Sequence, residues 1–198
     1  YIELNPWWNV PHSIATKEML PILKKSPGYL AGGDYLLLTR QGDNSSAING
    51  SSVDWASVTP ESFPYHIRQK PGPKNALGTT LFMFPNPHNV FIHDTPSRSI
   101  FSLEDRFFSH GCVRVENPMK LAMFLLKNQS GEEWTEARYK AVVETKEPRR
   151  IDLKNPLPVH ITYLTAWADN DGTVNFRRDA YNRDGTLKRA LSQVAMLK

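Results

Sequence analysis

Apolar and polar residues alternate along this chain in a pattern that predicts short strands with a few packed helices. Residues 159–167 and 173–176 flank Asn170-Asp171-Gly172, which is typical of the turn of a β-hairpin. Three further apolar runs have the length of buried strands. They are residues 35–40, 79–84 and 90–93.

Helical spacing is clearest in the second half of the chain. Asn117 and Pro118 suit the N-cap and the first position of a helix. The apolar residues that follow at helical spacing are Met119, Ala122, Met123 and Leu126. Ser130 and Glu133 form a capping box for a second helix that ends before Pro148. The predicted fold class is therefore α+β, mainly β with packed helices.

Residues 41–64 interrupt this pattern. They are rich in Gly, Ser, Asn, Asp and Pro, and few apolar residues, Trp55 among them, lie between these. A loop of this length is usually functional or mobile, so the segment is either a lid over an active site or a surface insertion. Because an exposed tryptophan on a loop is explained if it covers substrate, Trp55 is a candidate substrate-binding residue.

Composition sets limits on the function. The 198 residues fit one domain, and the net charge of +4 would favour an anionic polymer. The basic residues of the last third accompany no nucleic-acid-binding motif, so we interpret them as a solvated surface and expect no nucleic-acid partner. No apolar run approaches the roughly 18 residues that span a bilayer, so no membrane span is expected. With one cysteine, no internal disulfide framework is possible.

That cysteine, Cys112, is the strongest candidate for chemistry. It follows His93 by nineteen residues and His110 by two. A thiol attacks a carbonyl only as the thiolate, so a neutral imidazole must take its proton. His93 ends an apolar run and is the favoured base, because a strand end aims a side chain rigidly. His110 would face the same side as Cys112 only if that segment is extended.

The neighbours of Cys112 add supporting groups. Gly111 permits positive φ, so the amides of Gly111 and Cys112 can point at one oxyanion. Ser109 either supplies a hydroxyl to the site or shapes the turn. Arg114 could clamp a substrate carboxylate or form a surface ion pair. Asp94 is expected to bond the turn that follows it rather than to orient His93.

Two other interpretations of these residues remain open. A lone cysteine is often only a small buried apolar residue. The histidines, Asp94 and Cys112 could also ligate zinc, although a single thiol makes that unusual. We expect neither a metal nor an organic cofactor.

The pattern of His93, a gap, and then Ser109-His110-Gly111-Cys112 resembles the signature of the YkuD-type L,D-transpeptidases. These are cysteine enzymes that cross-link bacterial peptidoglycan. Other segments are similar to the large murein branch typified by YcbB. They are residues 5–11, 68–78, 82–86 and 112–115. The resemblance thus covers most of the chain.

The resemblance implies a YkuD-like β-sandwich or barrel catalytic domain over residues 1–198, with strands expected upstream of Tyr1 and residues 41–64 as the lid or capping loop. It implies that Cys112 is the acylated nucleophile and His93 its base, with His110, Gly111 and Arg114 shaping the site. Many relatives have a tyrosine where this chain has Phe91, so Phe91 would contact substrate without a hydroxyl.

The implied reaction joins two peptidoglycan stems. A tetrapeptide donor would acylate Cys112, and the diaminopimelate amine of an acceptor stem would then form a 3→3 cross-link. Carbapenems and other β-lactams would acylate the same thiol, and the protein would work in the periplasm or cell wall. The alternatives are an L,D-carboxypeptidase or endopeptidase with the same Cys-His site, and a non-catalytic wall-binding module.

Overall fold

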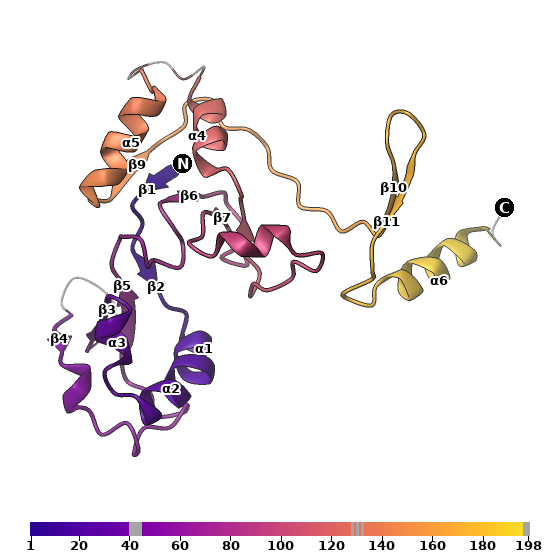
Figure 1. Cartoon of the computed structure of the whole chain (residues 1–198). Coiled ribbons are helices and arrows are strands. Elements are labelled where there is room, and N and C mark those ends of the chain that lie inside the picture. Colours follow the sequence, from indigo (N-terminus) through magenta and orange to yellow (C-terminus); the bar gives the residue numbers. More distant parts are fainter. Residues whose placement is uncertain (40–44, 128, 130, 132, 196–198) are drawn as a thin grey trace. The chain divides into compact units, whose positions relative to one another are not determined.

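A computed structural model describes the chain except for residues 40–44, 128, 130, 132 and 196–198 (Figure 1). The chain divides into two compact units, residues 1–157 and 158–198. The first unit contains two separate hydrophobic cores, each built on its own small sheet.

The sheet that carries His93 has five strands in the order β8-β7-β6-β1-β9. Its strands are β1 (Ile2–Leu4), β6 (Thr80–Phe82), β7 (Ile92–His93), β8 (Val113–Arg114) and β9 (Arg149–Ile151). All neighbours pair antiparallel except β7 and β8, which are parallel. A parallel pair requires a crossover connection, and residues 94–112 provide it.

One face of this sheet is apolar. Ile2 pairs with Phe82, Phe82 with Ile92, and these side chains pack against two helices. The helices are α4 (Pro118–Leu126) and α5 (Glu136–Thr145), and their buried side chains in this core are Ala122, Leu126 and Tyr139. This burial removes large apolar side chains from water and is the main stabilisation of the sheet.

The opposite face carries a row of mostly polar residues. Directly paired residues lie on the same face. Glu3 pairs with Leu81 and Arg150, Leu81 pairs with His93, and His93 pairs with Arg114. The register alone therefore places the candidate base on the face turned away from α4 and α5.

The second core of this unit is built on a four-stranded sheet, in the order β2-β5-β3-β4. Its strands are β2 (Trp8–Asn9), β3 (Tyr35–Leu38), β4 (Ala47–Ile48) and β5 (His66–Gln69). The helical segments around it are α1 (His12–Ile14), the π-helix η1 (Ala15–Met19), α2 (Leu20–Lys25), α3 (Tyr29–Gly32) and the 3-10 turn η2 (Gly50–Ser52). We call this group of elements the helical lobe.

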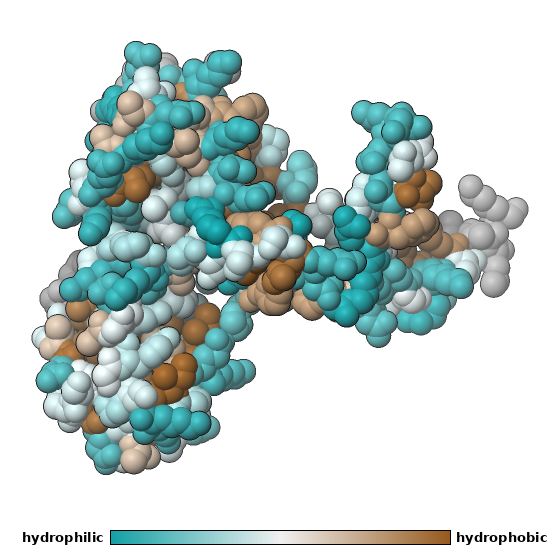
Figure 2. Space-filling model, viewed as in Figure 1, coloured by the Kyte–Doolittle hydropathy of each residue, from teal (hydrophilic) through white to brown (hydrophobic). Residues whose placement is uncertain are grey.

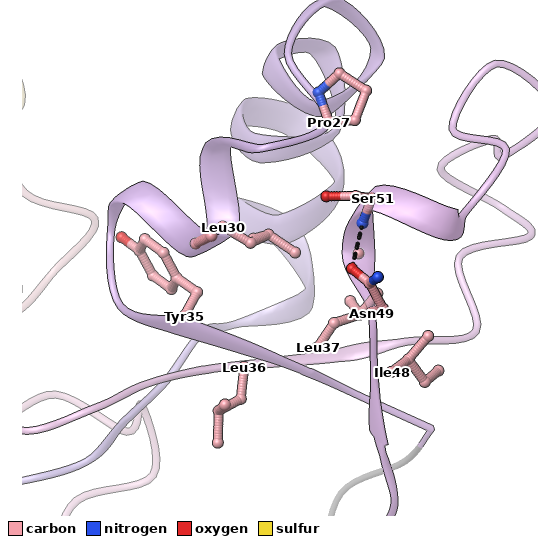
Figure 3. A pocket seen from close by; sticks show the side chains of 10 residues that line it. Pro27, Leu30, Tyr35, Leu36, Leu37, Ile48, Asn49 and Ser51 are labelled. Carbon is pink, nitrogen blue, oxygen red and sulfur yellow. Dashed lines mark hydrogen bonds between the residues drawn. The ribbon is translucent and has the colours of Figure 1, made fainter.

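The helical lobe contains a small hollow of about 160 Å³ (Figure 3). Leu30, Tyr35 and Ile48 are among the side chains that line it, and the polar Asn49 on its rim is already bonded to the Ser51 amide at 3.1 Å. Burial, with a smaller effect of the neighbouring Tyr29 hydroxyl, raises the pKa of Tyr35 to about 12, so its phenol stays neutral. The hollow is an uncharged gap in the packing of this lobe.

Residues 45–64 are anchored to the helical lobe, because Trp55, Val58 and Phe63 lie in its hydrophobic core. Trp55 is only 2% exposed, packs against Phe63 and Tyr65, and donates its indole N–H to the carbonyl of Gly50 at 2.8 Å. The expectation of an exposed Trp55 that covers substrate is therefore corrected. The few apolar residues of this segment pack in or against the core of the helical lobe. The sequence did not indicate this, because turn-forming residues dominate the composition of the segment.

The second unit, residues 158–198, contains the predicted hairpin. β10 (Ala166–Ala168) pairs antiparallel with β11 (Val174–Phe176), and α6 (Asp184–Ala195) follows. Tyr163 donates its hydroxyl to Asp179 at 2.6 Å. Several apolar side chains of this unit are exposed, as Figure 2 shows. They include Leu164, Phe176, Leu187 and Leu191.

The predicted elements are confirmed in part. The helix after Asn117 begins at Pro118 as expected. The next helix is capped by Thr135, whose hydroxyl accepts from the Arg138 amide at 3.2 Å, whereas Ser130 of the predicted capping box lies outside the described residues. Within the described part of the chain, no helix combines the length and the apolarity that crossing a membrane requires.

Candidate active site

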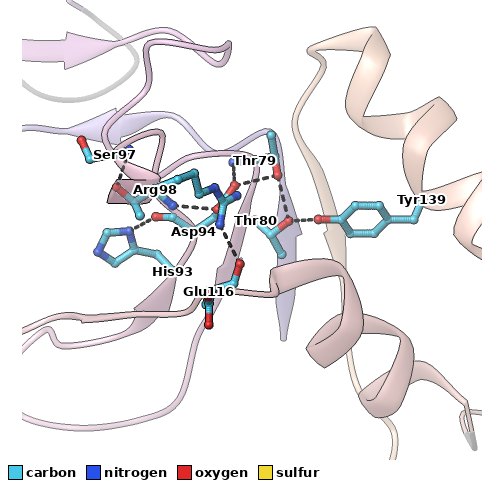
Figure 4. A network of polar contacts seen from close by, with 9 residues as sticks. Thr79, Thr80, His93, Asp94, Ser97, Arg98, Glu116 and Tyr139 are labelled. Carbon is cyan, nitrogen blue, oxygen red and sulfur yellow. Dashed lines mark hydrogen bonds and ion pairs between the residues drawn. The ribbon is translucent and has the colours of Figure 1, made fainter. Parts of the chain in front are cut away.

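His93 lies at the end of β7 and is 5% exposed. Its Nδ1 is 2.5 Å from the backbone carbonyl of Asp94 (Figure 4). Because a carbonyl only accepts, Nδ1 carries the proton and Nε2 keeps its lone pair. Burial lowers the pKa of His93 below its usual 6.5, an effect that the carbonyl of Asp94 partly offsets. The imidazole is therefore neutral near pH 7, as a general base must be.

The carboxylate of Asp94 is 2% exposed and fully bonded. Oδ2 accepts from the amide and hydroxyl of Thr79, at 2.8 and 3.0 Å, and Oδ1 accepts from the Thr95 amide at 2.7 Å and from the Arg98 guanidinium (Figure 4). The side chain of Asp94 thus bonds the turn after β7, as expected, and only its carbonyl meets His93. The buried charge is balanced by four donors.

Gly78 makes room for that carboxylate. Its φ is +63°, and a Cβ there would overlap the carboxyl group of Asp94. The turn that contains Gly78 is itself fixed by buried amides. Asn75 donates to the carbonyls of Pro6 and Lys70, at 2.9 and 3.0 Å.

The pairing of β7 with β8 brings Cys112 beside the base. The Val113 amide donates to the carbonyl of Phe91 at 3.0 Å, and the Val115 amide to the carbonyl of His93 at 2.9 Å. Arg114 is directly opposite His93, and Cys112 is two residues before it. Because alternate residues share a face, Cys112 lies diagonally across from His93 on the same face of the sheet.

Phe91 is part of the same arrangement. Its ring meets the His93 imidazole edge-on, with 5.7 Å between centroids. Phe91 directly precedes β7 and is two residues before His93, so the two side chains also share a face. On this alternation Phe91, His93, Cys112 and Arg114, all candidate site residues, lie on one face of the sheet.

Ser109 shapes the turn before the thiol. Its hydroxyl donates to the carbonyl of Cys112 at 2.6 Å and accepts from the Gly111 amide at 3.2 Å. Gly111 has φ +134°, which glycine tolerates and other residues rarely adopt. Of the two predicted oxyanion donors, the Gly111 amide is therefore bonded to Ser109 in this state.

His110 does not point along the strand. Residues 109–111 form a bend, and His110 Nε2 lies 2.7 Å from Glu18 Oε1 on η1. Both side chains are exposed, at 64% and 51%. The condition for His110 to share a side with Cys112, an extended segment, is not met. His93 is therefore the remaining candidate for the base, and His110 connects the motif to the helical lobe.

Arg114 is half-buried, and its Nε is a buried donor with no hydrogen-bond partner among the described residues. Its charge helps to lower the pKa of His93. This Nε is enclosed by the protein, so in this structure a ligand could reach only the outer part of the guanidinium. Trp55, the remaining candidate substrate-binding residue, packs in the hydrophobic core of the helical lobe, a cluster that contains neither His93 nor Arg114.

Sequence reasoning missed Arg98, Thr79 and Glu18. Arg98 carries a detectable signal, since it follows Asp94 by four residues. Glu18 carries none, because it meets His110 only through the tertiary structure. Over the described ranges, the structure contains no cluster of three or more His, Cys, Asp or Glu residues that could hold a metal.

A model of the YkuD family, the L,D-transpeptidase catalytic domain, matches residues 1–148. The chain belongs to the YkuD L,D-transpeptidase family. It is 35% identical over 189 residues to a Haemophilus influenzae protein named "Putative L,D-transpeptidase". This alignment covers 96% of the chain and 37% of that relative, so the chain spans little more than a third of the relative's length. The mixed helix and sheet architecture agrees with the α+β class expected for a YkuD domain.

Proposed function

We propose that this YkuD domain is a peptidoglycan L,D-transpeptidase that forms 3→3 cross-links through a thioester on Cys112. One observation supports the proposal: β8, which begins one residue after Cys112, pairs with β7 so that Arg114 lies directly opposite the buried, neutral His93. A nucleophile, its base and a cation close together are the parts that acyl transfer from a carboxylate-rich peptide requires.

Acylation begins when Nε2 of His93 takes the proton of the Cys112 thiol. The thiolate attacks the carbonyl between the third residue, an L-centre, and the terminal D-residue of a tetrapeptide stem. The C–N bond then breaks, and the imidazolium returns its proton to the leaving amine. A thioester remains on Cys112, and the D-amino acid is released.

Transfer reverses the proton movements. The diaminopimelate amine of a neighbouring stem attacks the thioester while His93 accepts its proton. The C–S bond breaks, the thiolate leaves, and a 3→3 amide cross-link is formed. During both steps the oxyanion would be bonded by the Cys112 amide, and by the Gly111 amide once it exchanges its bond with Ser109.

The remaining site residues would hold the stems. Arg114 would bind a donor carboxylate through the outer N–H groups of its half-buried side chain. Phe91 would pack against the stem, and Ser109 would fix the turn of the nucleophile. His110 would adjust that turn through Glu18 rather than exchange protons with Cys112.

We further propose that the protein belongs to the large YcbB-type branch and acts in the periplasm or cell wall, where its substrate is found. The segments quoted for that branch, residues 68–78 and 82–86 among them, include the turn that positions Asp94. Any covering of the site would come from the folded helical lobe, which contacts the motif through Glu18, rather than from a loose segment.

The test is incubation with purified disaccharide-tetrapeptide and mass analysis of the products. The native protein should give the cross-linked dimer, and Cys112→Ala and His93→Gln should give none. Arg138→Gln, which changes an arginine on α5, serves as the matched control and should retain activity. Tripeptide without dimer would show hydrolysis and overturn the transferase assignment.

A β-lactam provides a second measurement. A carbapenem should add its mass to the native protein and not to Cys112→Ala. An adduct on Cys112→Ala would remove this thiol from the mechanism.

A further inference from the structure

We propose that Arg98 is the positioning residue of the Cys112–His93 pair, acting by tying β8 to the turn that holds the base. The inference rests on the proposed function, because it assumes that His93 activates Cys112. Arg98 is the first residue of the 3-10 turn η3 (Arg98–Ser102) and reaches back to two places at once.

The first place is the buried carboxylate of Asp94. Nη2 of Arg98 donates to Oδ1 of Asp94 (Figure 4). The Asp94 side chain is 3% exposed, and the Arg98 side chain is 49% exposed. The backbone carbonyl of the same aspartate accepts the Nδ1 proton of His93. Fixing the aspartate therefore fixes the ring orientation and the tautomer in which Nε2 carries the lone pair.

The second place is the chain that follows the nucleophile. Nη1 of Arg98 donates to the backbone carbonyl of Glu116 at 2.8 Å. β8 has only two residues, and the ladder to β7 ends where the Val115 amide meets the carbonyl of His93. Arg98 adds a further link just beyond that last bond, on the same short parallel pair.

Together these contacts couple the two halves of the site. One arm of the guanidinium sets the base, and the other holds β8 in the register that places Cys112 beside it. Arginine suits this role because its planar fork presents two N–H groups in fixed directions, whereas lysine offers a single point charge on a flexible stem. Arg98 is not required to touch substrate.

The experiment compares Arg98→Gln, Arg98→Lys and Arg138→Gln with the native protein. Arg138 is a matched control because its guanidinium also donates to a backbone carbonyl, that of Glu133 at 2.8 Å, and it lies on α5, which packs on the opposite face of the sheet. The first readout is the rate at which iodoacetamide alkylates Cys112 at pH 7. The second is the nitrogen chemical shifts of His93, which report the tautomer. Thermal unfolding establishes that each variant is folded.

We expect Arg98→Gln to slow alkylation by about 10- to 100-fold, since a small displacement of reacting groups has an effect of that size. Its His93 should also lose the pure Nδ1-protonated tautomer. Arg98→Lys, which can restore only one of the two contacts, should be intermediate, and it decides the question if Arg98→Gln does not fold. Arg138→Gln should match the native protein in both readouts.

Native rates and a native tautomer in folded Arg98→Gln or Arg98→Lys would overturn the inference. Failure of the proposed function looks different. Native protein that alkylates rapidly in a His93-dependent manner but forms no peptide dimer would refute the transpeptidase assignment and leave the role of Arg98 intact.

Discussion

The proposed base, His93, and the proposed nucleophile, Cys112, are held in opposite ways. His93, Asp94 and Thr95 are 5%, 2% and 3% exposed, and every polar atom of the Asp94 carboxylate is bonded inside the protein. Residues 102–111, which lead to Cys112, are all exposed. Their fixed contacts include those of Ser109 and the meeting of His110 with Glu18.

This difference shows where the precision of the site originates. The base is fixed by the fold itself, so whatever disturbs it should also reduce folding stability. The thiol is fixed by a few exposed polar contacts and by its pairing with β7, so changes there should alter reactivity more than stability. The four experiments below challenge that contrast.

Gly78→Ala should have the largest effect and should act on the base. The added Cβ would overlap the Asp94 carboxyl group, and φ is +63°. Overpacking and left-handed strain together predict a loss of about 3 kcal/mol in the free energy of unfolding, with loss of transferase activity. Urea denaturation measures the first quantity. A change below about 1 kcal/mol would mean that the base side is not rigid.

The pH dependence should follow the neutral base. Burial lowers the pKa of His93 below 6.5, so protonation disfavours the folded state. Stability should fall as pH falls through the window from 6.5 to the native pKa, and level off below it. Transfer activity should fall about tenfold per pH unit only below that lowered pKa.

Unfolding the native protein and His93→Gln side by side at about pH 4–8 isolates the contribution of His93 protonation to the free energy of unfolding. The difference in stability should be constant above 6.5, the usual pKa, and should turn against the native protein below it. A difference that turns in favour of the native protein at low pH would show that the pKa is raised instead.

Gly111→Ala is the counterpart of Gly78→Ala on the nucleophile side. Its Cβ would lie 3.3 Å from Val90 Cγ2, and φ is +134°. Because the surrounding loop is exposed and can adjust, we expect a loss of about 1 kcal/mol in stability. Alkylation of Cys112 by iodoacetamide should nevertheless slow about tenfold. An equal stability loss in the two alanine variants would remove the contrast between the two sides.

Glu18→Gln should have the smallest effect. Exposed ion pairs contribute little, so the free energy of unfolding should change by less than about 0.5 kcal/mol. Alkylation of Cys112 should change by less than about threefold. Glu144→Gln, an exposed substitution on α5, is the control. A larger change in Glu18→Gln alone would show that the helical lobe sets the position of the thiol.

Residues with local signals in the sequence were predicted well. The helix at Pro118, the hairpin around Gly172 and the end of an apolar run at His93 all follow from adjacent residues. That Cys112 and Arg114 share a face is likewise a local consequence of strand alternation, whereas their placement opposite β7 depends on the pairing of β7 with β8.

What the sequence could not supply was long-range pairing. Strands of two or three residues, such as β2 and β8, have too little periodicity to detect. Trp55 was misplaced because its burial depends on Phe63 and Tyr65 folding back over it. Glu18 meets His110 across ninety-two positions of chain, and no spacing rule indicates that contact.

The crossover between β7 and β8 separates a fixed part of the chain from a part that can change. The two ends of that connection are held by strand pairing, whereas its middle, residues 102–108, is exposed. Exposed connections tolerate insertions and replacements well. Residues 102–108 can therefore be exchanged to alter the surface around this face of the sheet while the paired strands at both ends are left in place.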